Sequence, residues 1–140
     1  METLATTRTG VRENLDQEGP PRAAEARGQW RPPEDLACLG TAIMIDLLAT
    51  FKSDTGEQIS QLSCLLSQAN FAGVKSQVHM IKGAACQLGA GDLTSICAEL
   101  EAAALSGSLS HLGACMRRLD LEYMQLCSDM DAYLSIARTS

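Results

Sequence analysis

His79, Lys82 and Gly83 are the residues of this chain whose types and spacing could do chemistry. A neutral imidazole nitrogen is a nucleophile near neutral pH, because the unperturbed pKa of histidine is about 6.5. Lys82 follows one helical turn later, where its ammonium could hold an anion beside the ring. Gly83 removes a side chain at the next position, although glycine inside a helix costs about 1 kcal/mol relative to alanine. A glycine here is explained if a large partner must approach His79, because a side chain at this position would stand in its way.

An apolar stripe with helical spacing runs beside these three residues. Its members step by three or four and are Phe71, Val74, Val78, Ile81, Ala85 and Leu88. His79 is one position off this stripe, so we expect at least one edge of its ring to remain in solvent. Asn70 is a good N-cap for the helix, and Gly89 suits the left-handed position that follows its end.

Three other segments also carry apolar residues at helical spacing, and they predict three further helices that pack against the helix of His79 and hold it in place. We expect one helix over about residues 41–68, weakened at Gly56, one from a cap at Asp92 to about Leu105, and one from Ser108 or Leu109 onward. Their inward positions are Leu48, Phe51, Thr55, Ile59, Leu62 and Leu66, then Leu93, Ile96, Leu100 and Ala103, then Leu109, Leu112, Met116, Leu119, Tyr123, Leu126, Met130 and Tyr133. Four amphipathic helices with short connections predict an all-α fold, an antiparallel up-down four-helix bundle. A short N-terminal lead-in helix over residues 34–39 would precede it, behind Pro32-Pro33.

The composition divides the chain into an arm and a domain. Residues 1–33 hold two Pro-Pro pairs, three glycines and no sustained apolar period, so we expect a flexible N-terminal arm. Trp30 belongs to this arm, and its side chain could dock onto the domain. Residues 34–140 are expected to form the bundle. They hold six Lys or Arg against twelve Asp or Glu, and therefore the whole net charge of −6. An acidic domain repels phosphate backbones, which argues against nucleic-acid binding.

The sequence gives no sign of a membrane segment or a metal site. No apolar run approaches the roughly 20 residues of a membrane span, and no signal peptide opens the sequence, so we expect a soluble intracellular protein without membrane contact. The six cysteines are Cys38, Cys64, Cys86, Cys97, Cys115 and Cys127. None forms a C-x-x-C pair and neither histidine stands at zinc-finger spacing from them, so we expect reduced thiols in the core. Cys86 is the exception, because it lies two turns after His79 on the same face.

Other polar residues are expected to have structural or solvated roles. His111 should be solvated near the start of a helix. Glu99 and Glu101 lie two apart on a helix and do not face one another, so paired-carboxylate chemistry is not expected.

The run His79-Met80-Ile81-Lys82-Gly83 resembles the H-x-x-K-G signature of histidine-containing phosphotransfer (HPt) proteins. The resemblance covers about residues 40–135 and continues through Leu88-Gly89-Ala90, Leu93, Cys97, Leu100-Glu101 and Gly107. In the fourth helix, Cys115, Leu119 and Glu122-Tyr123 are more similar to free-standing plant-type members than to bacterial modules. The run Ala84-Ala85-Cys86 departs from the serine-rich run of those plant proteins.

This resemblance implies a phosphorelay intermediate. His79 would accept a phosphoryl group from an aspartyl-phosphate on a receiver domain and pass it to a second receiver. Lys82 would stabilise charge on the phosphoryl oxygens, and Gly83 would give the receiver room to dock. The implied partners are receiver domains of a hybrid histidine kinase and of response regulators, with the chain acting as a monomer. The implied location is the cytoplasm and, for a plant-type relay, also the nucleus.

Catalytic machinery beyond the histidine would belong to the partner. The sequence has no P-loop, no kinase Gly-rich loop and no metal-ligand cluster, so we expect a phosphate carrier without kinase activity. We expect no cofactor of its own, and Mg²⁺ supplied by the receiver domain. Docking would use an apolar patch beside His79, to which Met80 and residues near Met44 and Leu47 could contribute.

Two other functions share the same bundle. One is a non-catalytic helical adaptor that binds a partner through an apolar groove. The other is a thiol-based redox sensor that uses Cys86.

Overall fold

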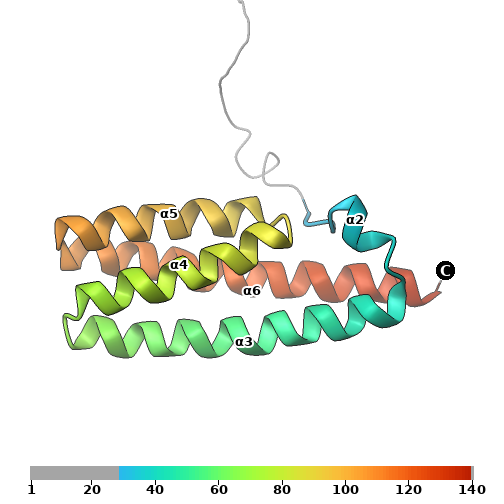
Figure 1. The fold of residues 1–140 in the computed structure, drawn as a ribbon, viewed down its shortest axis with the longest axis horizontal. Helices are drawn as coiled ribbons and strands as arrows, with labels where there is room; N and C mark the ends of the chain where they lie inside the picture. The colour runs from blue at the N-terminus through green and yellow to red at the C-terminus, as the bar shows by residue number, and fades with distance from the viewer. Residues whose placement is uncertain (1–28, 140) are drawn as a thin grey trace, which may run out of the picture.

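A computed structural model describes residues 29–139, and in this range the chain is helical with no strand. The helices are α2 (Glu34–Ala37), α3 (Thr41–Ser67), α4 (Phe71–Gln87), α5 (Gly91–Ser106) and α6 (Leu109–Thr139). The four long helices alternate in direction and form an antiparallel up-down bundle, with α2 as the short lead-in helix (Figure 1). The predicted fold class is therefore confirmed.

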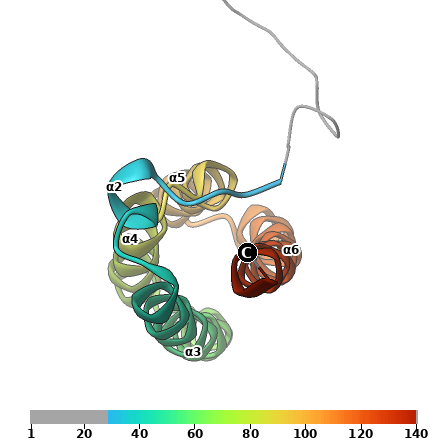
Figure 2. The ribbon, with the colours of Figure 1, turned by 90° about the vertical axis from the view of Figure 1, so that its right-hand side faces the viewer.

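Each long helix packs against the helix before and after it, and α3 packs against α6 to close the ring. The most extensive contact joins α4 and α5, which are the shorter two of the four long helices, with 17 and 16 residues against 27 in α3 and 31 in α6. Beyond the α4–α5 turn, α3 and α6 continue without these two neighbours, and α2 lies over that end of the bundle (Figures 1 and 2).

The predicted stripes face the core at nearly every position. In α3, Leu48, Phe51, Thr55, Ile59 and Leu62 are buried, and in α4 so are Val74, Val78, Ile81 and Ala85. Leu109 is the clear error, because 55% of its surface is exposed. It is the first residue of α6, directly after the turn that follows α5, so it is placed at the end of the bundle rather than between helices.

Local capping chemistry fixes the start of α4 but not the start of α5. The side chain of Asn70 accepts a hydrogen bond from the backbone N–H of Gly73 at 3.0 Å, which confirms the predicted N-cap. Gly89 has the predicted left-handed conformation after α4, with φ of +69°. Asp92 is not the N-cap of α5. The helix starts earlier, with Ala90 at the cap position, so Asp92 lies in the first turn, where its charge faces the positive end of the helix dipole.

Only part of the predicted arm can be compared with the structure, because residues 1–28 lie outside the described range. Residues 29–33 form a segment, here called the strap, that crosses the end of the bundle from the α6 side to α2 (Figure 2). Trp30 in this strap is buried, with 8% of its surface exposed, and its ring packs edge-on against Tyr133 at 5.8 Å between centroids. Its indole Nε1–H donates to the carbonyl of Leu88 at 2.8 Å, and its backbone N–H donates to Asp129 Oδ2 at 3.2 Å. Trp30 thus belongs to the core although it precedes the predicted boundary at residue 34.

Candidate functional site

His79 lies in the middle of α4, on the solvent side of the buried stripe. Val78 and Ile81 hold this part of the helix in the core with no exposed surface, while 74% of the His79 side chain is exposed. The expectation that its ring would keep an edge in solvent is confirmed. The rigid helix beneath it fixes the position of the ring, and the exposed edge leaves room for a reactant.

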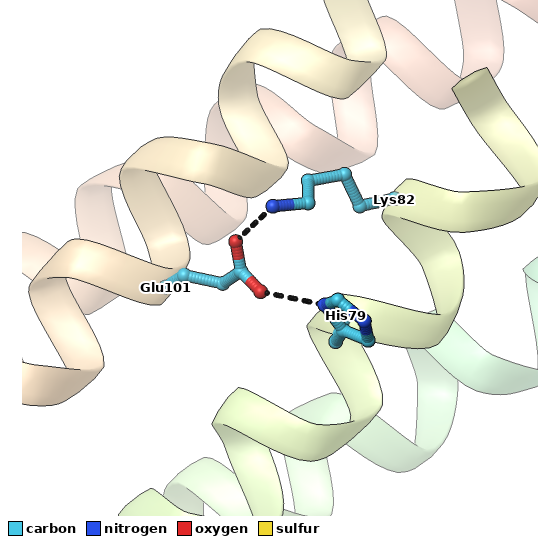
Figure 3. Close-up of polar contacts among 3 residues, drawn as sticks. All are labelled: His79, Lys82 and Glu101. Carbon is cyan, nitrogen blue, oxygen red and sulfur yellow. Dashed lines mark hydrogen bonds and ion pairs between the residues drawn. The ribbon is translucent and has the colours of Figure 1, made fainter.

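A carboxylate from α5 contacts both His79 and Lys82 (Figure 3). Glu101 Oε2 lies 3.2 Å from His79 Nδ1, and Glu101 Oε1 lies 2.5 Å from Lys82 Nζ. The Glu101 side chain is largely buried, with 17% of its surface exposed, and Lys82 is 30% exposed. The structure therefore joins the predicted nucleophile and the predicted cation through a third residue.

Sequence reasoning did not assign Glu101 to this site. The Leu100-Glu101 pair is part of the family resemblance, but the one role considered for Glu101 was paired-carboxylate chemistry with Glu99. The structure agrees that these two do not act together, because Glu99 pairs with Arg118 of α6 instead. The missed signal was the register of the α4–α5 hairpin. In two antiparallel helices, residues equally far from the turn lie opposite each other. His79 and Glu101 stand equally far before and after Ala90, which is the N-cap of α5.

The charge of Glu101 determines which nitrogen of His79 carries a proton. The hydrogen bond from Lys82, supported by that of His79, lowers the pKa of Glu101 below its usual value, although burial opposes the shift. Glu101 is therefore ionised at neutral pH and can only accept hydrogen bonds. Neutral His79 must then donate from Nδ1, which leaves the lone pair on Nε2.

The helix turn after His79 presents little that would obstruct a partner. A Cβ atom at Gly83 would meet no atom within 4 Å beyond the backbone of its own helix, so the packing of the bundle does not require glycine there. Met80 is 55% exposed, as a docking patch requires. Met44 is 1% exposed and cannot contribute, because it faces the core from α3, and Leu47 is half-buried.

A family model for the Hpt domain matches residues 46–132, which is more than half of the chain and includes His79, Lys82, Gly83 and Glu101. The chain belongs to the Hpt domain family. Hpt domains carry out histidine phosphotransfer in two-component phosphorelays and interact with receiver domains. Searches of curated proteins and of solved structures gave no significant match to the chain.

The thiols of this Hpt domain are less buried than the sequence suggested. Cys97 and Cys115 are buried, Cys127 is half-buried, and Cys38, Cys64 and Cys86 are exposed. The expectation of core thiols was wrong for Cys38 and Cys64, because each occupies a solvent-facing position. Cys86, which the sequence set apart as lying on the face of His79, is exposed as well. Cys97 interacts electrostatically with Glu101 and Lys82 of the site. Burial raises the pKa of its thiol to about 12, with a further contribution from the charge of Glu101 and an opposing one from Lys82, so it is not a nucleophile at neutral pH.

Two further properties concern residues 29–139 of the Hpt domain. They contain no group of three or more His, Cys, Asp or Glu side chains arranged to hold a metal ion. No helix in that range combines the length and apolar character that crossing a membrane requires.

Proposed function

We propose that His79 Nε2 accepts a phosphoryl group from the aspartyl-phosphate of one receiver domain and passes it to an aspartate of another. The observation that carries this proposal is the arrangement at Glu101. One ionised carboxylate fixes the proton on His79 Nδ1 and holds Lys82 beside the ring, while most of the imidazole surface is open to solvent. A reactive lone pair is thereby directed outward from a rigid helix.

In the transfer step, the Nε2 lone pair forms a bond to phosphorus as the bond from phosphorus to the aspartyl oxygen breaks. The electron pair of the broken bond stays on the aspartate, which leaves as a carboxylate. His79 then carries the phosphoryl group on Nε2 and a proton on Nδ1, so its ring is positively charged. Glu101 Oε2, at 3.2 Å from Nδ1, stabilises that charge. The return of the phosphoryl group to a second receiver runs through the same steps in reverse.

Lys82 can serve Glu101 and the phosphoryl group at the same time. An ammonium group has three N–H donors, and Glu101 Oε1 takes one of them. The Lys82 side chain is 30% exposed, so the other donors are open to phosphoryl oxygens that arrive at His79. The positive charge of Lys82 would then stabilise the bound phosphoryl group against repulsion from Glu101.

The receiver would dock on the exposed side of α4. Gly83 lets a partner surface approach the helix backbone, and Met80 offers an exposed apolar contact one position from His79. We propose that Mg²⁺ and most of the catalytic groups come from the receiver, and that the chain itself does not use ATP. Met80→Ala should slow the transfer and leave the helical circular dichroism unchanged. Unchanged transfer kinetics would remove Met80 from the docking surface.

Transfer from a phosphorylated receiver domain tests the proposed function directly. We expect the wild-type chain to take up label that is acid-labile and base-stable, and His79→Gln to take up none. His111→Gln is the matched control, because His111 is the other histidine of the chain and is exposed on α6. Uptake that persists in His79→Gln would refute the assignment.

The same experiment separates the two other functions. A folded wild-type chain that takes up no phosphate from several receivers, yet binds a partner equally well as His79→Gln, would be an adaptor. Binding that is lost on mild oxidation, restored by reductant and unaffected by oxidation in Cys86→Ser would indicate a redox sensor.

A further inference from the structure

The outer face of α6 carries two large apolar side chains that face solvent. Leu121 is 68% exposed and Met124 is 65% exposed, and they lie three positions apart on one side of the helix. They belong to a row of exposed residues, here called the α6 outer row, on the side opposite the buried stripe. The row steps by four and three, as a coiled-coil seam does, and consists of Arg117, Leu121, Met124, Ser128, Asp131 and Ser135.

The two charges of the α6 outer row lie at equal distances from Met124. Arg117 is seven residues before Met124 and Asp131 is seven residues after it, which is about 10.5 Å along the helix in each direction. Arg117 forms no ion pair within residues 29–139. Asp131 is 65% exposed and accepts from Lys52 through Oδ1, so its second oxygen can accept from another donor. The row is therefore symmetric in the position of its charges and opposite in their sign.

A second copy of the chain fits this pattern if its α6 runs antiparallel to the first. With Met124 on a two-fold axis, residues equally far before and after Met124 lie opposite one another. Arg117 of each copy then faces Asp131 of the other, and Leu121 lies beside the small Ser128. A parallel pair would instead place Arg117 against Arg117 and Asp131 against Asp131, and like charges across an interface are unfavourable. The charge pattern thus selects the antiparallel arrangement.

We propose that the α6 outer row is the interface of a two-fold homodimer, in which two α6 helices pack antiparallel about Met124. Two arginine–carboxylate pairs flank an apolar centre made by Leu121 and Met124 of both copies. The interface is confined to one helix of each copy, so we expect association to be weak and dependent on concentration. This differs from the monomer that the family resemblance implies.

The dimer would leave the phosphotransfer site open. α4 packs against α3 and α5 and lies across the bundle from α6, so the outer face of α6 is turned away from His79 (Figure 2). Both His79 side chains of a dimer therefore remain accessible to receiver domains. The proposal does not depend on phosphotransfer and can be tested without a receiver.

Sedimentation velocity in the presence of a reductant tests the association. The wild type should shift from monomer to dimer as its concentration rises. Arg117→Asp and Asp131→Arg should each weaken self-association by roughly tenfold or more, because each places like charges opposite one another. The two variants should associate when they are mixed, since an acid on one copy then faces an arginine on the other at both positions. Lys75→Asp makes the same change in charge on an exposed position of α4 and should have no effect, with circular dichroism as the check on folding.

Thiol cross-linking tests the direction of the two helices. The three exposed cysteines, Cys38, Cys64 and Cys86, are first replaced by serine. In that background Met124→Cys should form a disulfide-linked dimer in air, because position 124 faces its own copy. Arg117→Cys should not, since its two copies would be about 21 Å apart along the antiparallel pair.

Three results would overturn the proposal. The first is a wild type that stays monomeric at every concentration that remains in solution. The second is a mixture of Arg117→Asp and Asp131→Arg that associates no better than either variant alone. The third is cross-linking of Arg117→Cys without that of Met124→Cys, which would indicate a parallel pair.

Discussion

Glu101 contacts two side chains of α4 with its two oxygens, and its negative charge matters to both. Toward His79 it selects the tautomer and would stabilise a charged ring, and toward Lys82 it accepts a hydrogen bond from the ammonium. Glutamine has the same shape without the charge, and its amide can either donate or accept. The substitution Glu101→Gln therefore separates the charge of this residue from its packing.

We expect Glu101→Gln to slow phosphoryl transfer to His79 by roughly tenfold to a hundredfold, as for other residues that orient and stabilise a reacting group. Rapid-quench kinetics with a phosphorylated receiver measures this. Glu99→Gln is the matched control, because Glu99 is on the same helix and pairs with Arg118 rather than with α4. In ¹⁵N spectra of the ring, the wild type should show the proton on Nδ1, and Glu101→Gln should show a mixture of tautomers. A rate unchanged from the wild type would limit Glu101 to a structural role.

The lowered pKa of Glu101 makes part of the stability depend on pH. Its folded-state pKa lies below the ordinary 4.5, because the Lys82 hydrogen bond favours the ionised form. The folded state therefore gains stability that is fully present above pH 4.5 and is lost as the pH falls through the folded pKa. Urea unfolding should show Glu101→Gln to be less stable than the wild type at neutral pH. The difference should shrink well below pH 4.5, and one that grew in acid would contradict the assignment.

At the scale of the helices, two interior glycines have opposite surroundings. A Cβ at Gly83 would meet open space, so Gly83→Ala should raise the free energy of unfolding by up to about 1 kcal/mol through helix propensity. We expect the same variant to slow transfer from a receiver, since the added methyl group holds the partner away from the backbone. Chemical denaturation and transfer kinetics on one sample would show the two effects together. A more stable variant with unchanged transfer would remove Gly83 from the docking surface.

Gly56 of α3 is required by packing instead. A Cβ there would lie 2.8 Å from the hydroxyl of Tyr123, which donates to the carbonyl of Lys52. Gly56→Ala should therefore lower the free energy of unfolding by about 1 kcal/mol or more, despite the better propensity of alanine, because Tyr123 must move and give up that bond. Pairing Gly56→Ala with Tyr123→Phe tests this reason. The cost of the alanine should be smaller where the hydroxyl is absent.

The helices themselves could be predicted, because each buries one apolar stripe, and the residues of that stripe recur every three or four positions in the sequence. Asn70 and Gly89 mark helix ends through local chemistry, and both were predicted. The errors occur where position in the bundle decides the outcome. Leu109 matches the period of α6 but lies at the end of the bundle, and Asp92 is a good capping residue in a helix that starts before it.

At the scale of the whole molecule, Trp30 connects the strap to the end of the helix that carries His79. Its indole donates to the carbonyl of Leu88, just after the last turn of α4. Trp30→Phe keeps an aromatic ring but removes this donor, so we expect a loss of roughly 1–3 kcal/mol in the free energy of unfolding. Urea denaturation followed by circular dichroism measures it. Tyr133→Phe keeps the edge-on ring contact and should change stability by less than about 0.5 kcal/mol.

His79, Lys82 and Gly83 could be predicted as candidate site residues from local sequence because they lie within about one turn of one helix. Glu101 and Trp30 could not, because each acquires its role through a residue distant in the chain. Glu101 meets His79 only when α4 and α5 pack in one register, and Trp30 reaches Leu88 only when the strap crosses the bundle. Local periodicity predicts helices, but contacts of this kind depend on their assembly.

That register has a consequence for how the length of the chain can vary. His79 and Glu101 stand equally far from Ala90, so one residue inserted within α4 after His79, or within α5 before Glu101, would shift the two side chains relative to each other by about 100° of rotation and about 1.5 Å of rise. The carboxylate would then miss the imidazole even though every helix survived. The connections α3–α4 and α5–α6 join no pair that the chemistry uses. Insertions are therefore expected to be tolerated in the α3–α4 and α5–α6 connections and excluded from the helical segments between His79 and Glu101.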